Sequence, residues 1–174
     1  MADTKITDLS SAGTILGTDV TNVVRSGTDY KTTVTDITTY VSGALVEKER
    51  IVTFQIPGTL ATGDGTGLGT RGFLVPSIYN GKNLVSCVAV VETAGTSGSA
   101  NLFQVRRVRS ASPVDMLSTR IMIDAGEVSS TTAATAYVIN TSNDDVATGD
   151  VIYIDVDQLN TTPPTTLTVY LGFV

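Results

Sequence analysis

The sequence contains no histidine and no tryptophan, and its only cysteine is Cys87. Without histidine, Ser-His-Asp triads, histidine zinc sites and histidine general bases are excluded. A single cysteine forms neither a disulfide within the chain nor a thiolate metal cluster, and in its apolar surroundings we expect Cys87 to be a small buried hydrophobic residue. These absences predict a protein that is not an enzyme, with no catalytic residue, no cofactor and no metal ion.

Charge is also scarce. Only 16% of the residues are charged, the net charge is −6, and the isoelectric point is near 4.4. Binding to nucleic acid requires clustered Lys and Arg that neutralise phosphates, so we expect no nucleic-acid partner. No apolar run reaches the roughly 18 residues of a membrane-spanning segment, so we expect no membrane partner. The 41% of apolar residues and the mean hydropathy of +0.20 predict one folded domain with an appendage.

The first 34 residues contain too few large apolar side chains to form a core. Ordering each residue costs about 1–2 kcal/mol of backbone entropy, so we expect this segment to become ordered by lying on a partner. The turn-forming residues 26–29 predict a hairpin within it. We therefore expect residues 1–34 to be an extended attachment arm that contacts its partner through Ile6, Leu9, Ile15, Leu16, Val20, Val23 and Val24.

Residues 35–50 form the one amphipathic helix that we predict. Thr35 or Asp36 can cap its first turn, and the charged residues 47–50 close it. About four turns are marginal for an isolated helix, so its apolar stripe must pack on the β-domain of its own chain or on copies of itself around a symmetry axis. The stripe consists of Ile37, Tyr40, Val41, Ala44 and Leu45.

From Ile51 onward the apolar residues alternate with polar ones, which indicates β-strands. Thr and Val are abundant, and such β-branched residues suit a pleated surface. We predict that residues 51–174 form an all-β domain, an eight-stranded antiparallel jelly-roll-like sandwich that follows the arm and the short helix. The expected strands are 51–56, 71–76, 83–93, 101–109, 115–124, 133–140, 150–157 and 166–173.

The third expected strand, 83–93, is apolar on both faces. A strand of this kind is covered on both sides, and the outer cover can be the helix or a neighbouring subunit. We therefore expect an oligomer. Its interface is predicted to include Val88 and Val90 of this strand, together with Ile37, Tyr40, Val41 and Leu45 of the helix.

Two charged patterns fall in the predicted sandwich. Four of the eleven basic residues lie in two successive strands, where Arg106 and Arg120 can project from one outward face. They either pair with Asp or Glu on a solvated face of their own sheet or contact an acidic neighbouring subunit. The aspartates 144, 145, 150, 155 and 157 have no EF-hand spacing, and we favour solvated charge over a Ca²⁺ site.

The glycine-rich segment 63–69 contains Asp64-Gly65-Thr66-Gly67. This sequence is superficially like an aspartic-protease loop, but the chain has one such motif where a pair of aspartates is needed. The segment also lacks the strand and helix that flank a nucleotide-binding loop. We therefore expect a flexible loop.

The arm resembles the N-terminal attachment segment of bacteriophage virion surface proteins, among them tail fibres, head fibres and capsid decoration proteins. The matching features are Thr-Lys-Ile-Thr-Asp-Leu at 4–9, Thr-Asp-Val at 18–20, and the Gly turn with its following strand at 27–37. The sandwich segments 69–76, 148–157 and 167–171 are similar to the β-domain of the same kinds of protein.

This resemblance implies a homotrimer on the virion surface, assembled in the host cytoplasm and joined by its arm to the major capsid protein or another virion protein. The chain has no long shaft between arm and sandwich, which favours a capsid decoration or cement protein over a fibre. The alternative is a tail- or head-fibre module that recognises a host surface glycan.

Overall fold

The computed structural model describes residues 20–25, 28–33, 48–65 and 72–174. The chain divides into two units, residues 1–47 and residues 48–174. The described residues are mostly β-strand and the pairings are antiparallel, which confirms the all-β prediction. No helix among these residues has the length and apolarity needed to cross a membrane.

The described part of the first unit is a hairpin. Strand β1 (Val20–Arg25) pairs antiparallel with β2 (Thr28–Thr33), so that Arg25 lies opposite Thr28 and two residues separate the strands. This confirms the hairpin predicted around residues 26–29. Most of the predicted helix 35–50 lies outside the described residues.

The end of that helix was predicted wrongly. Lys48 and Glu49 are not helical, and Arg50 begins the first strand of the second unit. The Glu49 carboxylate accepts a hydrogen bond from the Ser86 hydroxyl and lies against Gly172. A Cβ atom at Gly172 would collide with this carboxylate, so the absence of a side chain there lets the incoming chain lie close to the sheet.

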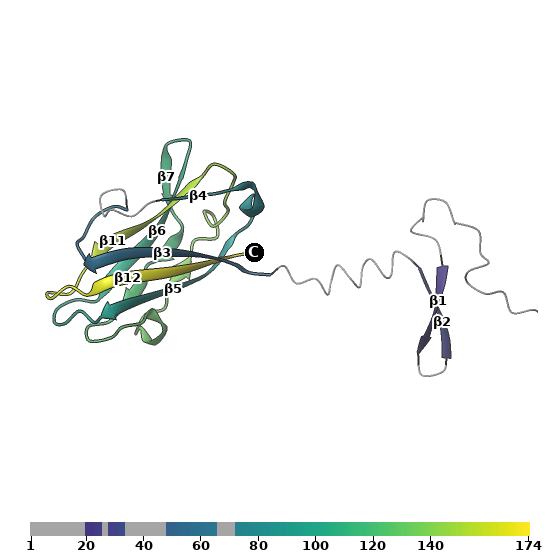
Figure 1. The fold of residues 1–174 in the computed structure, drawn as a ribbon, viewed down its shortest axis with the longest axis horizontal. Coiled ribbons are helices and arrows are strands. Elements are labelled where there is room, and N and C mark those ends of the chain that lie inside the picture. The colour runs from purple at the N-terminus through teal and green to yellow at the C-terminus, as the bar shows by residue number, and fades with distance from the viewer. Residues whose placement is uncertain (1–19, 26–27, 34–47, 66–71) are drawn as a thin grey trace, which may run out of the picture. The chain divides into compact units, whose positions relative to one another are not determined.

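The second unit is a sandwich of two main antiparallel sheets (Figure 1), with a third sheet of two short strands beside them. In the first sheet β12 (Thr165–Phe173) lies between β3 (Arg50–Thr59) and β5 (Leu84–Thr93). The side chains of β3 alternate strictly between buried and exposed over its first seven residues after Arg50, as a sheet with one face on the core requires.

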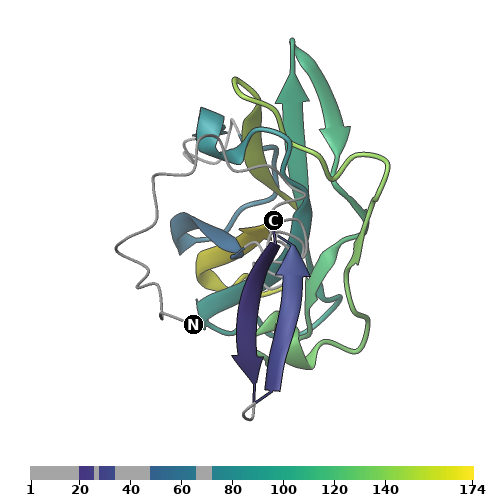
Figure 2. The same cartoon turned by 90° about the vertical axis from the view of Figure 1, so that its right-hand side faces the viewer.

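The second sheet is centred on β6 (Asn101–Arg109) and β11 (Val151–Gln158). The short strand β4 (Phe73–Leu74) pairs with β11, while β7 (Ser112–Asp115) and β9 (Ile121–Ile123) pair with β6. The β6–β7 hairpin projects beyond the rest of the sandwich, as Figure 2 shows. Its two turn residues, Ser110 and Ala111, both have positive φ, which is typical of a type I′ turn.

The strand order is that of a jelly roll. Among the eight predicted strands, the first (β3) lies beside the eighth (β12), which lies beside the third (β5). In the other sheet the second (β4), seventh (β11), fourth (β6) and fifth (β9) are neighbours, and β7, which begins in a segment where no strand was predicted, also pairs with β6. Successive strands thus cross repeatedly between the layers, as two Greek keys require.

Two predicted strands are less regular than expected. The predicted strand 115–124 is broken at Met116 and Arg120, because β8 (Leu117–Thr119) leaves β6 and pairs with β10 (Val138–Ile139). Of the predicted strand 133–140, only β10 is a strand. The segment before it is held on β5 mainly by side chains, with the Cys87 amide donating to the Tyr137 hydroxyl and the Ala89 amide to the Ser130 hydroxyl.

The core lies between the sheets and contains one inward-facing set of apolar residues from every major strand. Cys87 belongs to this set, and burial raises the pKa of its thiol to about 12, so it is protonated at neutral pH. The largest fully buried side chains are Phe103, Phe173, Leu84, Met116, Ile121, Ile123, Ile152, Ile154, Leu167 and Leu171.

The substitution Ile154→Ala should lower the free energy of unfolding by about 2–5 kcal/mol, because it leaves a cavity where the side chain is fully buried. The control Ile78→Ala removes an isoleucine that is 55% exposed and should change stability by less than about 0.5 kcal/mol. Urea unfolding followed by circular dichroism measures both. Equal losses in the two variants would contradict the assignment of the core.

Candidate functional site

The predicted contact residues fall in three places. Val88 and Val90 lie half-buried on the outward face of β5, opposite Tyr170 and Thr168 of β12. Val20, Val23 and Val24 lie on β1. The other predicted contact residues lie outside the described part of the chain, and they are Ile6, Leu9, Ile15, Leu16, Ile37, Tyr40, Val41 and Leu45.

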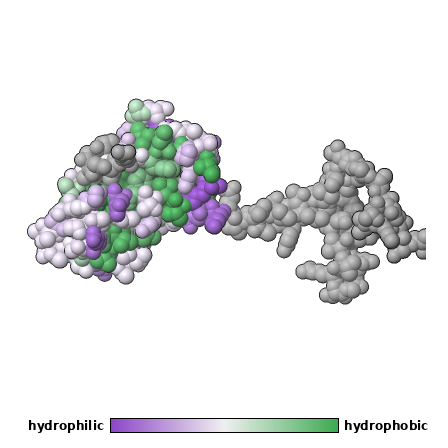
Figure 3. All heavy atoms as spheres, viewed as in Figure 1, coloured by the Kyte–Doolittle hydropathy of each residue, from purple (hydrophilic) through white to green (hydrophobic). Residues whose placement is uncertain are grey.

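The outward face of the β3–β12–β5 sheet is partly apolar, as expected from the pattern of β5. Ile51 is 52% exposed and Tyr170 is 41% exposed, and both lie on this face with Val88. Figure 3 shows apolar areas on this side of the sandwich, interrupted by polar ones. The inward residues of β5 belong to the core, so the strand does carry apolar side chains on both faces.

All four arginines of the predicted basic group form ion pairs with aspartates of the same chain. Arg106 and Arg120 lie on the outward face of the second sheet, where they pair with Asp155 and Asp157 of β11. This agrees with the prediction that these two arginines share a face. Pairing within the chain leaves less unmatched positive charge for an acidic neighbouring subunit. It therefore supports the alternative in which these arginines pair with Asp or Glu of their own sheet.

The Arg106–Asp155 pair fastens the glycine-rich segment to the sheet. Nε and Nη2 of Arg106 donate to the two carboxylate oxygens of Asp155 at 2.6 and 3.0 Å, and the Gly65 amide donates to the same carboxylate at 2.6 Å. A Cβ atom at Gly65 would lie 2.7 Å from Cβ of Tyr153, so only glycine fits. The expectation of a flexible loop is therefore wrong at Gly63 and Gly65, which are bound to β11.

Arg107 and Arg109 reach the opposite face of β6 and hold the loop that precedes β11. Arg109 bonds both Asp150 and Asp145, and Arg107 bonds Asp145. Burial raises the pKa of Asp150, but hydrogen bonds from Arg109 and from the Ala147 amide outweigh it, and the net shift is downward. The pKa of Asp145 is lowered in the same way, with the two arginines outweighing its partial burial.

Asp157 is shifted in the other direction. Burial raises its pKa, the Arg120 guanidinium opposes this, and the nearby negative charges of Asp155 and Asp115 add to the rise. Burial is the largest of these causes, so the net shift of the pKa is upward despite the ion pair with Arg120. Among the described side chains, no group of three or more Cys, Asp or Glu residues is arranged to hold a metal ion.

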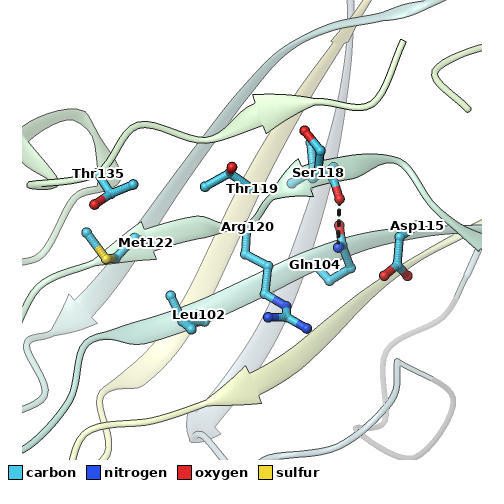
Figure 4. A pocket seen from close by; sticks show the side chains of 9 residues that line it. Leu102, Gln104, Asp115, Ser118, Thr119, Arg120, Met122 and Thr135 are labelled. Carbon is cyan, nitrogen blue, oxygen red and sulfur yellow. Dashed lines mark hydrogen bonds between the residues drawn. The ribbon is translucent and has the colours of Figure 1, made fainter. Parts of the chain in front are cut away.

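A pocket of about 350 Å³ opens beside this pair, at the point where β8 separates from β6 (Figure 4). Its floor is Gln104, which is 4% exposed. In Figure 4 the Gln104 side chain lies between Arg120 and Asp115. The remaining lining comes from Leu102, Leu117, Ser118, Thr119, Met122 and Thr135.

The Gln104 amide is fixed in orientation. Its Nε2 donates to the Leu117 carbonyl at 3.0 Å, and its Oε1 accepts from the Val105 amide at 2.9 Å. Each end of the amide retains one further hydrogen-bonding position. Sequence reasoning missed Gln104 and Asp115, because nothing in the local pattern shows that a neighbouring strand will depart and uncover them.

Comparison of the chain with protein-family models, with curated proteins and with solved structures gives no significant match.

Asp150→Asn should lower the free energy of unfolding at pH 7 by about 1–3 kcal/mol, because it removes a buried carboxylate that accepts from Arg109. The folded-state pKa of Asp150 is below its usual value of about 3.9. Its contribution is thus present above that pH and is lost as the pH falls through the folded-state pKa. The difference between wild type and variant should shrink below about pH 4, as urea midpoints at pH 7 and pH 3 will show.

The matched control is Asp144→Asn on the same loop, since Asp144 takes part in no ion pair among the described residues. A loss at Asp144 as large as that at Asp150, or a loss at Asp150 that is independent of pH, would contradict this account.

Proposed function

We propose that the protein is a non-enzymatic structural protein of a bacteriophage virion, a capsid decoration or cement protein that attaches through residues 1–34. The observation that carries this proposal is the division of the chain into two units, with a core of apolar side chains inside residues 48–174. The described core residues run from Val52 to Phe173, and in this proposal the arm serves a different partner. The resemblance of the arm to virion attachment segments supports the same conclusion.

Attachment in this proposal is the sum of many weak contacts. An extended arm lends backbone N–H and C=O groups to a sheet edge of the capsid protein, while its spaced apolar side chains fill surface pockets. Several arms on one oligomer raise the effective concentration of each, so modest contacts together give tight binding. A protein that binds only the assembled shell stabilises it by mass action.

The oligomer in this proposal is a homotrimer. Support comes from the outward face of the β3–β12–β5 sheet, where Ile51, Val88 and Tyr170 leave apolar surface at the sandwich exterior. Exposed apolar side chains grouped on one face are commonly part of an interaction surface.

The second candidate function is recognition of a host surface glycan by a fibre module. The pocket over Gln104 favours it, because a hollow with a few fixed polar groups is the usual form of a small-ligand site. The two functions are compatible, since they use different parts of the chain.

Particles that lack the protein test the attachment arm. Added full-length protein should bind them and raise the temperature at which they rupture, because binding to the shell stabilises it. A truncated protein that begins at Lys48 should keep its β-sheet circular dichroism but do neither. Binding by the truncated protein would move the attachment site to the sandwich and overturn the proposed role of the arm.

Sedimentation equilibrium tests the homotrimer. The full chain should give three times its 18.1 kDa mass at micromolar concentration, and Val88→Asp should reduce it, because a carboxylate would be buried in the interface. The control Ile78→Asp, at an exposed position away from this sheet, should leave the mass unchanged. A single-chain mass for the wild type would exclude the trimer.

A further inference from the structure

The pocket over Gln104 presents hydrogen-bond donors and acceptors side by side. Arg120 keeps 47% of its side chain exposed and has more N–H groups than its bond to Asp157 uses. Asp115 is exposed, and its carboxylate makes no ion pair among the described residues. Gln104, between them, offers one free N–H and one free acceptor position.

The charges around the pocket select against an anion. Arg120 is the one basic residue of the lining, and it is already paired with Asp157. Asp115 adds a second negative charge and takes part in no ion pair among the described residues, so Asp115, Arg120 and Asp157 together carry a net charge of −1.

The choice among uncharged and cationic ligands follows from hydrogen-bonding capacity. A protonated amine only donates, so it would match Asp115 but leave the guanidinium of Arg120 without an acceptor. A hydroxyl group both donates and accepts, and a ligand with several neighbouring hydroxyls matches both residues at once. Leu102 and Met122 add an apolar patch on the same lining, which suits a ligand that also has a C–H surface.

We propose that this pocket binds one neutral pyranose unit of a carbohydrate, held by hydrogen bonds from its hydroxyl groups to Asp115, Arg120 and Gln104 and by contact of its C–H face with Met122. A volume of about 350 Å³ is at the lower end of the ~300–1,000 Å³ that is typical of small-ligand sites. The pocket is open to solvent on the outward face of the sheet, so a sugar at the end of a longer glycan can enter it. The proposal deepens the second candidate function, recognition of a glycan, and rests on it; it does not depend on attachment through the arm.

The test is a titration of the ¹⁵N-labelled full chain with methyl glycosides of glucose, galactose, mannose and N-acetylglucosamine, followed by ¹H–¹⁵N correlation NMR. At least one of them should shift the amide resonances of Gln104, Asp115, Thr119 and Arg120, and leave those of β3 and β12 unchanged. Asp115→Ala should weaken this binding about tenfold or more, because a hydrogen bond to a charged group is lost.

Two further variants separate binding from folding. Asp144→Ala removes a carboxylate from a loop outside the pocket and should bind as the wild type does. Thr135→Lys places a long side chain at an exposed position of the lining, where it should block the sugar without disturbing the core. Amide spectra without sugar show whether each variant is folded.

Sialic acid and a simple diamine serve as the anionic and cationic probes. Binding of either probe in preference to every neutral glycoside would overturn the assignment of a neutral sugar. So would shifts that lie outside the pocket, shifts that Asp115→Ala leaves intact, or the absence of any shift at tens of millimolar sugar. None of these results bears on whether the arm attaches to a particle, so failure here and failure of the proposed function are distinguishable.

Discussion

The antiparallel pairing of β6 with β11 is the interaction on which the rest of the sandwich depends. On the inward face this pair contributes Phe103, Val105, Ile152 and Ile154 to the core. On the outward face the same register places Tyr153 opposite Arg106 and Asp155 opposite Gln104. A shift of one residue would exchange the two faces and bury the charges. The register therefore determines at once where the core lies and where the charged face lies.

The ion pairs of this sheet fix the positions of loops on the sandwich, and they contribute little net free energy to folding. A buried ion pair gains Coulomb energy but loses the hydration of both charges, so its net contribution to stability is often small. Removing one partner is costly, because the other is left buried alone. Asp155 thus holds Gly65 and Arg106 in one arrangement, and Asp150 does the same for the loop before β11. Such pairs select one arrangement of loops on a core that apolar burial stabilises.

The two outward faces of the sandwich differ in character. The face of β3, β12 and β5 is partly apolar, which suits contact with another protein surface. The face of β11 and β6 is charged and contains the hollow over Gln104, which suits a small polar ligand. A decoration protein with these features would use its arm for attachment, one face for oligomerisation and the other for a ligand. Each of these roles is open to a separate experiment.

The sequence by itself determined the all-β class, the hairpin of the arm and the positions of the long strands, because alternation with period two and turn residues are local signals. It also predicted that Arg106 and Arg120 project from one outward face, on the expectation that their two successive strands form a hairpin. Only the tertiary structure decided that the predicted strand 115–124 is broken and that Gly65 is bound to Asp155. The pocket arises in the same way, because β8 leaves β6 to pair with β10 and uncovers Gln104. These features depend on contacts between segments that are far apart in the sequence. Such contacts form only when the two sheets pack on their shared core, so no local sequence pattern predicts them.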